Sequence, residues 1–225
     1  MVKFFLQIVC PVIILFGFLS TANAALEVRL GGKAVYDTDL NITWLTNANA
    51  GAGSKFDNGT STTDGLMDWH NANAWAESIN IEGISGWRLP TALNSDGSIC
   101  GGFNCTGSEM GHLFYIELSG TAHNSILTSS DPDLSLFSNI QGTGIIYPYW
   151  LSTIYQADVN AYSFQMAHLD NFFAGAQSLS ALDNEHFGWA VHDGDVALIP
   201  EPQTYAMLFL GILAIIGHSI LSQRN

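Results

Sequence analysis

Residues 86–91 read Gly86-Trp87-Arg88-Leu89-Pro90-Thr91, so that Arg88 stands between two large apolar residues and a proline follows. Successive side chains of a strand point to opposite faces, so we expect Trp87 and Leu89 to face the core and Arg88 to point the other way. Pro90 should end the strand, because it has no N–H to join a sheet. Arg88 has two conceivable uses: an ion pair or carbonyl contact that braces the core, which we favour, or a place in a binding site.

An amphipathic helix is predicted on each side of this strand. The first lies within residues 67–80 and is ended by the glycines of 83–86. The second begins at Ser108, a good N-cap, reaches about Leu118 and stops at Gly120. Apolar residues repeat at helical spacing in both, namely Trp69, Ala72, Trp75, Ala76 and Ile79 in the first and Met110, Leu113, Phe114 and Leu118 in the second.

Short strands are predicted on both sides of the helical region, with a long polar, glycine-rich loop at 47–65. Clusters of β-branched and aromatic residues between turn signals are typical of antiparallel strands. The order predicts an α+β fold with two helices followed by a late, mostly antiparallel sheet. The predicted strands are 27–30, 34–36 and 42–45 early in the chain, then 149–155, 161–166, 172–176 and 187–191.

The chain is acidic, with 6 Lys and Arg residues against 20 Asp and Glu residues among 225. If a leader containing Lys3 is removed, 5 basic residues remain against 20 acidic ones, a balance of −15 with neutral histidine. Nucleic acid is not expected as a partner, because binding a polyphosphate needs a basic footprint. Neutral glycans, cationic partners and metal-bridged contacts suit this charge better.

The N-terminus has the pattern of a secretion signal. Lys3 precedes an apolar run over 4–19, and the small-residue pattern Ala22-Asn23-Ala24 follows. A signal peptidase would cut after Ala24, so the mature chain should begin at Ala25. Residues 1–24 are therefore predicted to be a signal peptide.

Two of the three cysteines should remain in the mature chain, because Cys10 lies in the signal. Cys100 and Cys105 are separated by only four residues. In an oxidising compartment, such a pair predicts a disulfide that closes a short loop. A zinc site would need further ligands, and no second Cys pair or nearby His pair supplies them in the sequence.

The C-terminal segment 199–225 combines a proline-containing start with an apolar stretch. Pro200-Glu201-Pro202 is followed by mainly apolar residues over about 205–221, and Arg224 stands near the end. A helix of about 17 to 25 apolar residues spans a bilayer, so 205–221 just reaches this range and predicts a membrane helix. By the positive-inside rule Arg224 would stay in the cytoplasm, with everything before Pro200 outside.

This order resembles the PEP-CTERM sorting signal of Gram-negative bacteria, with Pro200, Glu201, Pro202 and Arg224 as the matching residues. The resemblance implies that an exosortase recognises the tail and removes it, in a setting linked to exopolysaccharide production. It also implies an exported precursor anchored in the inner membrane, which is then delivered to the cell surface or the extracellular matrix. A plain C-terminal anchor that is never cut is the alternative.

The region between the two ends, 25–198, has the size of one domain. It resembles the C-terminal domain of the Legionella collagen-like adhesin, a secreted domain often found with PEP-CTERM tails. Its Trp-Arg-Leu-Pro-Thr string is also similar to the C-type-lectin-like and formylglycine-generating-enzyme folds, which implies a lectin-like α+β architecture. The resemblance rests on Val35-Tyr36-Asp37, Asn41-Ile42-Thr43-Trp44, Gly86-Trp87-Arg88-Leu89-Pro90-Thr91, Gly107-Ser108-Glu109-Met110-Gly111-His112-Leu113 and Tyr149-Trp150-Leu151-Ser152-Thr153.

The sequence favours a protein without enzymatic activity. It has no Gly-x-Ser-x-Gly element, and its histidines at 70, 112, 123, 168, 186 and 192 lack zinc-binding spacing, which favours scattered surface positions. A secreted hydrolase stays open as an alternative, because a triad formed in space needs no sequence motif.

No cofactor is expected, and a structural calcium ion is the one alternative. Asp193 with Asp195, or Asp131 with Asp133, could supply carboxylates to such an ion. Turn formation by Asp-Gly and Asp-Pro explains the same residues equally well.

Together these features predict a secreted, non-catalytic adhesion or matrix-binding module that recognises a polysaccharide. Exposed aromatic side chains can stack on sugar rings without any charge, and Trp150 and Tyr155 are the candidates for this contact. A purely structural matrix protein is the competing prediction. Glycan binding that is lost when an exposed aromatic residue is changed would favour adhesion.

Overall fold

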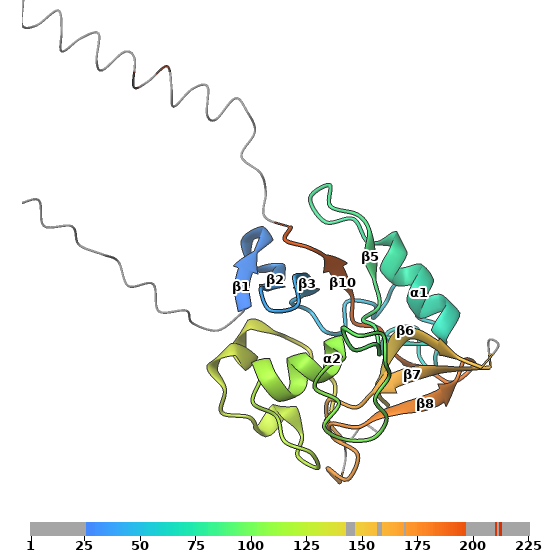
Figure 1. Ribbon diagram of the computed structural model, residues 1–225. Helices are drawn as coiled ribbons and strands as arrows, with labels where there is room; N and C mark the ends of the chain where they lie inside the picture. The colour runs from blue at the N-terminus through green and yellow to red at the C-terminus, as the bar shows by residue number, and fades with distance from the viewer. Residues whose placement is uncertain are drawn as a thin grey trace, which may run out of the picture.

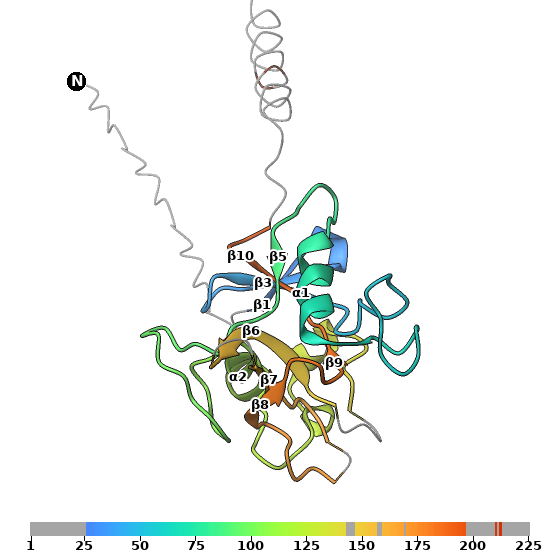
Figure 2. The same cartoon turned by 90° about the vertical axis from the view of Figure 1, so that its right-hand side faces the viewer.

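The computed structural model describes residues 26–142, 147–156, 159–168 and 170–196, together with Leu210 and Ile212. These residues form an α+β fold with two α-helices and mostly antiparallel strands, as the sequence predicts. Two sheets of five strands lie one above the other, in the orientation of Figure 1 and again in the turned view of Figure 2.

The first sheet joins segments from three distant parts of the chain. The predicted early strands pair as a meander, and the last strand, β10, pairs antiparallel with both β3 and β5. The strand order is β1 (Leu26–Arg29), β2 (Ala34–Asp37), β3 (Ile42–Leu45), β10 (Val191–Asp193) and β5 (Trp87–Arg88). The early strands therefore belong to the same sheet as the end of the domain.

The second sheet contains most of the late strands. Its pairs are antiparallel except for β6 and β9, which run parallel. The strand order is β4 (Leu66–Met67), β9 (His186–Phe187), β6 (Tyr149–Tyr155), β7 (Asn160–Phe164) and β8 (Gln177–Ala181).

The predicted strand at 172–176 is wrong. Phe172 and Phe173 lie in a turn in which the backbone N–H of Ala174 donates to the carbonyl of Asn171. Gly175 follows with a φ of +86°, a conformation that glycine adopts without strain and that interrupts an extended chain. The strand begins only at Gln177, where the sequence shows fewer β-branched and aromatic residues.

Both predicted helices are present. Helix α1 (Trp69–Ser78) is capped by Asp68, whose side chain accepts from the backbone N–H of Asn71 at 2.8 Å. Its buried residues are Ala72, Trp75 and Ala76, and it packs on β4, β5 and β6.

The second helix changes its winding partway along. Ser108 caps α2 (Glu109–His112) as predicted, with its hydroxyl accepting from the N–H of Gly111. The helix then continues as a π-helical turn, η2 (Leu113–Glu117), in which the N–H of Leu118 donates to the carbonyl of Leu113. Three short 3₁₀ turns complete the described elements: η1 (Leu30–Gly32), η3 (Ile126–Thr128) and η4 (Pro132–Leu136).

Trp189 lies at the centre of the core, in the segment that crosses from β9 in one sheet to β10 in the other. Its ring centroid lies 5.5 Å from that of Trp44 on β3 and 5.4 Å from that of Tyr149 on β6. The ring centroid of Phe137 lies 5.3 Å from that of Trp189. The indole N–H of Trp189 donates to the carbonyl of Leu45 at 2.8 Å. One aromatic cluster therefore joins the two sheets.

The predicted processing sites lie outside the described residues, namely Ala24, Ala25, Pro200, Glu201, Pro202 and Arg224. Most of the predicted membrane helix at 205–221 lies outside them as well; Leu210 and Ile212 are described and are helical. Within the part of the chain that the structure describes, no helix combines the length and apolar character needed to cross a membrane.

Candidate functional site

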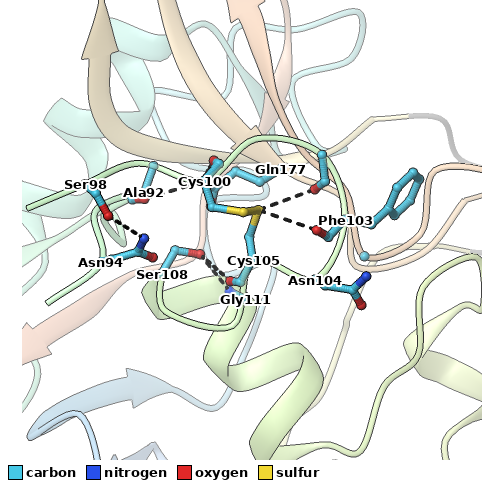
Figure 3. The surroundings of a disulfide bond; sticks show 12 residues. Ala92, Asn94, Ser98, Cys100, Phe103, Asn104, Cys105, Ser108, Gly111 and Gln177 are labelled. Atoms are coloured by element: carbon cyan, nitrogen blue, oxygen red, sulfur yellow. Dashed lines mark hydrogen bonds between the residues drawn. A yellow bond between two sulfur atoms is a disulfide. The ribbon is translucent and has the colours of Figure 1, made fainter. Parts of the chain in front are cut away.

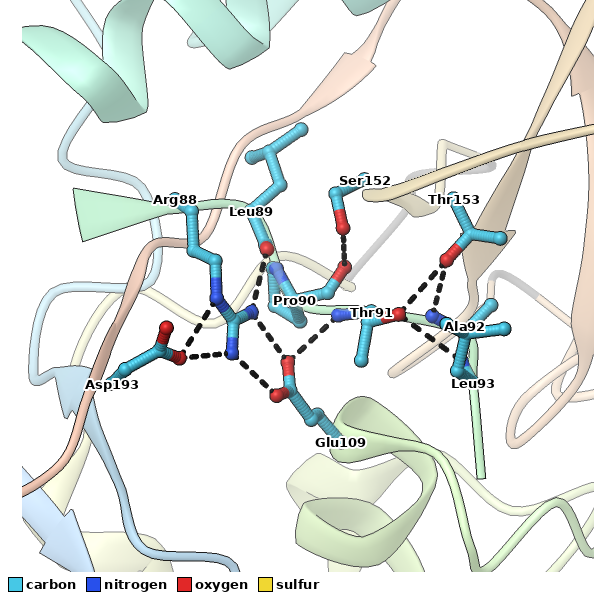
Figure 4. Close-up of polar contacts among 10 residues, drawn as sticks. All are labelled: Arg88, Leu89, Pro90, Thr91, Ala92, Leu93, Glu109, Ser152, Thr153 and Asp193. Atoms are coloured by element: carbon cyan, nitrogen blue, oxygen red, sulfur yellow. Dashed lines mark hydrogen bonds and ion pairs between the residues drawn. The ribbon is translucent and has the colours of Figure 1, made fainter. Parts of the chain in front are cut away.

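Arg88 is fully engaged in holding three segments together (Figure 4). Its guanidinium makes two parallel bonds to Glu109 on α2, at 2.7 and 2.8 Å, and two bonds to one oxygen of Asp193 on β10, at 2.5 and 3.0 Å. Its Nη1 also donates to the carbonyl of Leu89 at 3.0 Å. Burial alone would lower the pKa of Arg88, but the bonds and charges of Glu109 and Asp193 outweigh it and raise the pKa.

The neighbours of Arg88 match the sequence prediction. Trp87 and Leu89 are buried in the core, and Glu109 also accepts from the backbone N–H of Thr91 at 2.7 Å. The ion pair predicted for Arg88 is confirmed. With each of its N–H groups directed at a protein oxygen, Arg88 serves the fold and has no donor left for a ligand.

Three of the four carboxylates considered for calcium are engaged in other contacts. Asp193 pairs with Arg88, and Asp195 pairs with Arg29 on β1 at 2.7 Å. Asp131 caps η4 by accepting from the N–H of Asp133, and it also accepts from the hydroxyl of Ser119 at 2.6 Å. Ion pairs and turn formation account for these residues.

The predicted disulfide between Cys100 and Cys105 is present, with a Cα–Cα distance of 5.4 Å. Its loop is tied to the start of β8 by Gln177, which exchanges two backbone bonds with Gly102, both 2.8 Å long. The side-chain amide of Gln177 donates to the carbonyl of Cys100 at 2.7 Å. Figure 3 shows Gln177 next to the disulfide. The disulfide closes the loop, and Gln177 holds the loop against the second sheet.

Trp150 does not fit the glycan-stacking prediction, because it is completely buried. Its indole N–H donates to the carbonyl of Met67 at 2.8 Å, and its ring packs 4.3 Å from that of His186. Strand β6 lies inside the second sheet with both faces covered at this end, so the run Tyr149, Trp150 and Leu151 is buried without alternation. Three consecutive large apolar residues are the sequence signal that indicates such burial.

Tyr155 does lie at the surface, as predicted. It ends β6 with 38 % of its surface exposed, and its ring lies 6.1 Å from that of Tyr162 on β7. This pair offers one small aromatic surface at the end of the hairpin.

A larger aromatic surface lies elsewhere, and the sequence prediction missed it. Four ring contacts connect five side chains in a row, which we call the aromatic ridge. Successive ring centroids are 4.1, 5.8, 4.8 and 5.3 Å apart. Phe172 and Phe173 are 59 % and 49 % exposed. The ridge consists, in spatial order, of Phe103, His123, Phe172, Phe173 and His168.

A groove of about 400 Å³ runs beside one end of the ridge. Phe173 and His168 form part of its wall, and the remainder comes mainly from β7, β8 and the start of β9. Its polar groups are hydroxyls, one amide and two imidazoles, and none of the lining residues is Asp, Glu, Lys or Arg. The lining residues are Pro148, Ser163, Gln165, His168, Phe173, Ala176, Ser178, Leu179, Ser180 and His186.

His186 lies neutral at the inner side of this groove. Its Nδ1–H donates to the carbonyl of Glu185 at 2.5 Å, and its Nε2 accepts from the hydroxyl of Ser180 at 2.7 Å. Burial lowers the pKa of His186 to about 4, although the Glu185 carbonyl acts in the opposite direction. His186 therefore presents no charge to the groove at neutral pH.

The prediction of scattered surface histidines is confirmed for His70 and His123, which are exposed, and is wrong for His186, which is buried. His123 and His168 also belong to the aromatic ridge. His112 lies near two buried carboxylates, Asp37 and Glu117, with one ligand atom of each residue within 4.8 Å of the others. Among the described residues, this group is the one set of three or more His, Cys, Asp or Glu side chains arranged closely enough to hold a metal ion.

Comparisons with protein-family models, with curated protein sequences and with solved structures return no match for this chain.

Proposed function

We propose that this protein is a secreted, non-catalytic module of the cell envelope or the exopolysaccharide matrix that binds a neutral glycan. The observation that supports it most directly is the aromatic ridge beside an uncharged, hydroxyl-lined groove. Sugars bind through stacking of their apolar faces on aromatic rings and through hydrogen bonds to a few fixed polar groups. Exposed Phe172 and Phe173 supply the first, and the hydroxyls of Ser178 and Ser180 supply the second.

The acidic balance of the chain favours a neutral ligand over an acidic one. With 20 acidic residues against 6 basic ones, the surface repels polyanions, while a groove without charged residues does not select against neutral sugars. We also propose that the domain has a C-type-lectin-like or formylglycine-generating-enzyme-like architecture, which the sequence resemblance supports.

Affinity electrophoresis of the full-length protein in gels containing a neutral polysaccharide tests the glycan-binding proposal. We expect retardation by at least one of hydroxyethylcellulose, galactomannan and mixed-linkage β-glucan. Phe172→Ala and Phe173→Ala should each weaken binding about fivefold, since one stacking contact is worth about 1 kcal/mol. Both side chains are exposed, so these variants should fold normally.

Two control variants make this test specific. Val28→Ala removes an equally exposed apolar side chain on β1, and it should bind like the wild type. Tyr155→Ala tests the smaller aromatic surface at the hairpin end. Loss of binding in Tyr155→Ala alone would move the site to that surface, and no binding to any polysaccharide would favour a purely structural matrix protein.

The proposed route to the matrix rests on the two ends of the sequence, with residues 1–24 as a signal peptide and 199–225 as the tail removed by an exosortase. Intact mass of the protein from membrane, surface and medium fractions of its host tests this route. We expect a species that begins at Ala25 and ends near Pro200, found outside the inner membrane. A chain that keeps the tail and stays in the membrane fraction would show a plain anchor instead.

A further inference from the structure

We infer that Asp37, His112 and Glu117 form a binding site for a divalent transition-metal ion, with Zn²⁺ as the best match. The three residues come from different elements: Asp37 ends β2, His112 ends α2, and Glu117 ends η2. Their potential ligand atoms all lie within 4.8 Å of one another, and His112 Nε2 lies 3.0 Å from Glu117 Oε1. This inference is independent of the glycan-binding groove.

The π-helical turn explains how His112 and Glu117 meet. In a regular α-helix, residues five apart point in directions about 140° different, so their side chains do not converge. The wider turn at 113–117 brings position 117 back under position 112. Single π-turns are often found at functional sites, because they place side chains where an α-helix does not.

Asp37 supplies an observation that is independent of the clustering. It is completely buried, and its Oδ1 accepts from the backbone N–H groups of Asp39 and Leu40, at 3.1 and 2.9 Å. Its Oδ2 is buried too, yet it has no hydrogen-bond partner. Burial raises the pKa of Asp37, and the nearby indole N–H of Trp44, which acts against this, makes no hydrogen bond of ordinary geometry.

A buried carboxylate oxygen without a donor is costly, and a bound cation removes that cost. Glu117 is also buried, with 4 % of its side chain exposed. Among the described residues, no Lys or Arg pairs with either carboxylate, and the other charges acting on the cluster come from the acidic Asp39 and Asp133. The charge around these two carboxylates is therefore negative and attracts a cation. Within the cluster, His112 is the one side chain that can carry a positive charge.

The donor set indicates the class of metal. One imidazole nitrogen and two carboxylate oxygens suit Zn²⁺ and its first-row neighbours, whereas Ca²⁺ prefers six to eight oxygen ligands. Ligands around tetrahedral zinc lie about 3.3 Å apart, so small side-chain rotations would close the present spacing. Three protein ligands leave the fourth position for water. A metal here would join the end of β2 to the second helix.

Metal analysis of the full-length protein, first stripped with a chelator and then dialysed against Zn²⁺, tests this inference. We expect one Zn²⁺ per chain and a melting temperature raised by about 5 to 10 °C at a Zn²⁺ concentration a hundred times the Kd. His112→Gln and Glu117→Gln should each lower the Zn²⁺ affinity by about a hundredfold or more. Ca²⁺ at the same concentration should give no shift.

His70→Gln is the matched control, because His70 is an exposed histidine on α1. It should keep the zinc content and the thermal shift of the wild type. If Glu117→Gln does not fold, the comparison of His112→Gln with His70→Gln still decides the result. Equal zinc content in these two variants, or no thermal shift in the wild type, would overturn the inference and leave His112 and Glu117 as an ion pair of the fold.

Discussion

His186 shows how burial sets the chemistry of a single residue. His186 is 7 % exposed, and both ring nitrogens form hydrogen bonds, one as a donor and one as an acceptor. Burial keeps the charged imidazolium away from water and lowers the pKa to about 4, well below the ordinary value of 6.5.

The stability of the protein should fall between pH 6.5 and pH 4 because of this residue. In that window the unfolded chain binds a proton at His186 and the folded chain does not, so acid favours unfolding. The full effect is about 3 kcal/mol, reached near pH 4, and it is absent above pH 6.5. Urea unfolding from pH 7 to pH 4.5 measures it.

A variant separates this effect from the titration of carboxylates in the same range. His186→Gln should give a shallower decline of the unfolding free energy with falling pH than the wild type. His70→Gln controls for the loss of an exposed histidine. Parallel pH profiles for His186→Gln and the wild type would contradict the prediction.

At the scale of elements, the second helix is fitted closely against the disulfide loop. A Cβ atom added to Gly111 on α2 would lie 1.8 Å from the carbonyl oxygen of Cys105. Cys105 is buried, and its carbonyl also accepts from the hydroxyl of Ser108 at 3.1 Å. The small residue at position 111 is therefore needed for the close approach of the helix and the loop.

Gly111→Ala should lower the free energy of unfolding by about 3 kcal/mol, because the backbone must move to relieve the clash. Gly101→Ala is the matched control in the disulfide loop, where an added Cβ meets nothing within 4 Å. It should change stability by less than about 0.5 kcal/mol. Urea unfolding of both variants measures the difference, and similar stabilities for the two would show that the contact is loose.

The elements also show which parts of the site were predictable. Ser108 and the apolar spacing after it predicted the second helix, because capping and amphipathicity are local properties. They did not predict the change to a π-turn at 113–117, so the approach of His112 to Glu117 was missed. The ridge was missed for a similar reason: Phe172 and Phe173 looked like strand residues, and their exposure follows from the turn before Gly175.

At the scale of the whole molecule, the crossing segment between β9 and β10 makes one core of two sheets. Trp189 contacts Trp44 in the first sheet and Tyr149 in the second, and it is completely buried. Removing its ring would open a cavity between the sheets.

Trp189→Ala should therefore lower the free energy of unfolding by about 4 kcal/mol. We expect one cooperative transition in urea, followed both by fluorescence and by circular dichroism, because both sheets depend on the same cluster. Phe172→Ala, an exposed aromatic truncation, should stay within about 1 kcal/mol of the wild type. Two separate transitions in the wild type would contradict a shared core.

Local sequence patterns were enough to predict two helices, the Ser108 cap, most of the short strands, the Cys100–Cys105 disulfide, and the burial of Trp87 and Leu89. These follow from interactions between residues close in the chain. Three features followed only from the way the chain packs in three dimensions: β10 pairs with β3, Trp150 is buried, and Asp37 lies close to His112 and Glu117. Such contacts connect distant segments, and their formation depends on how all the elements share one core.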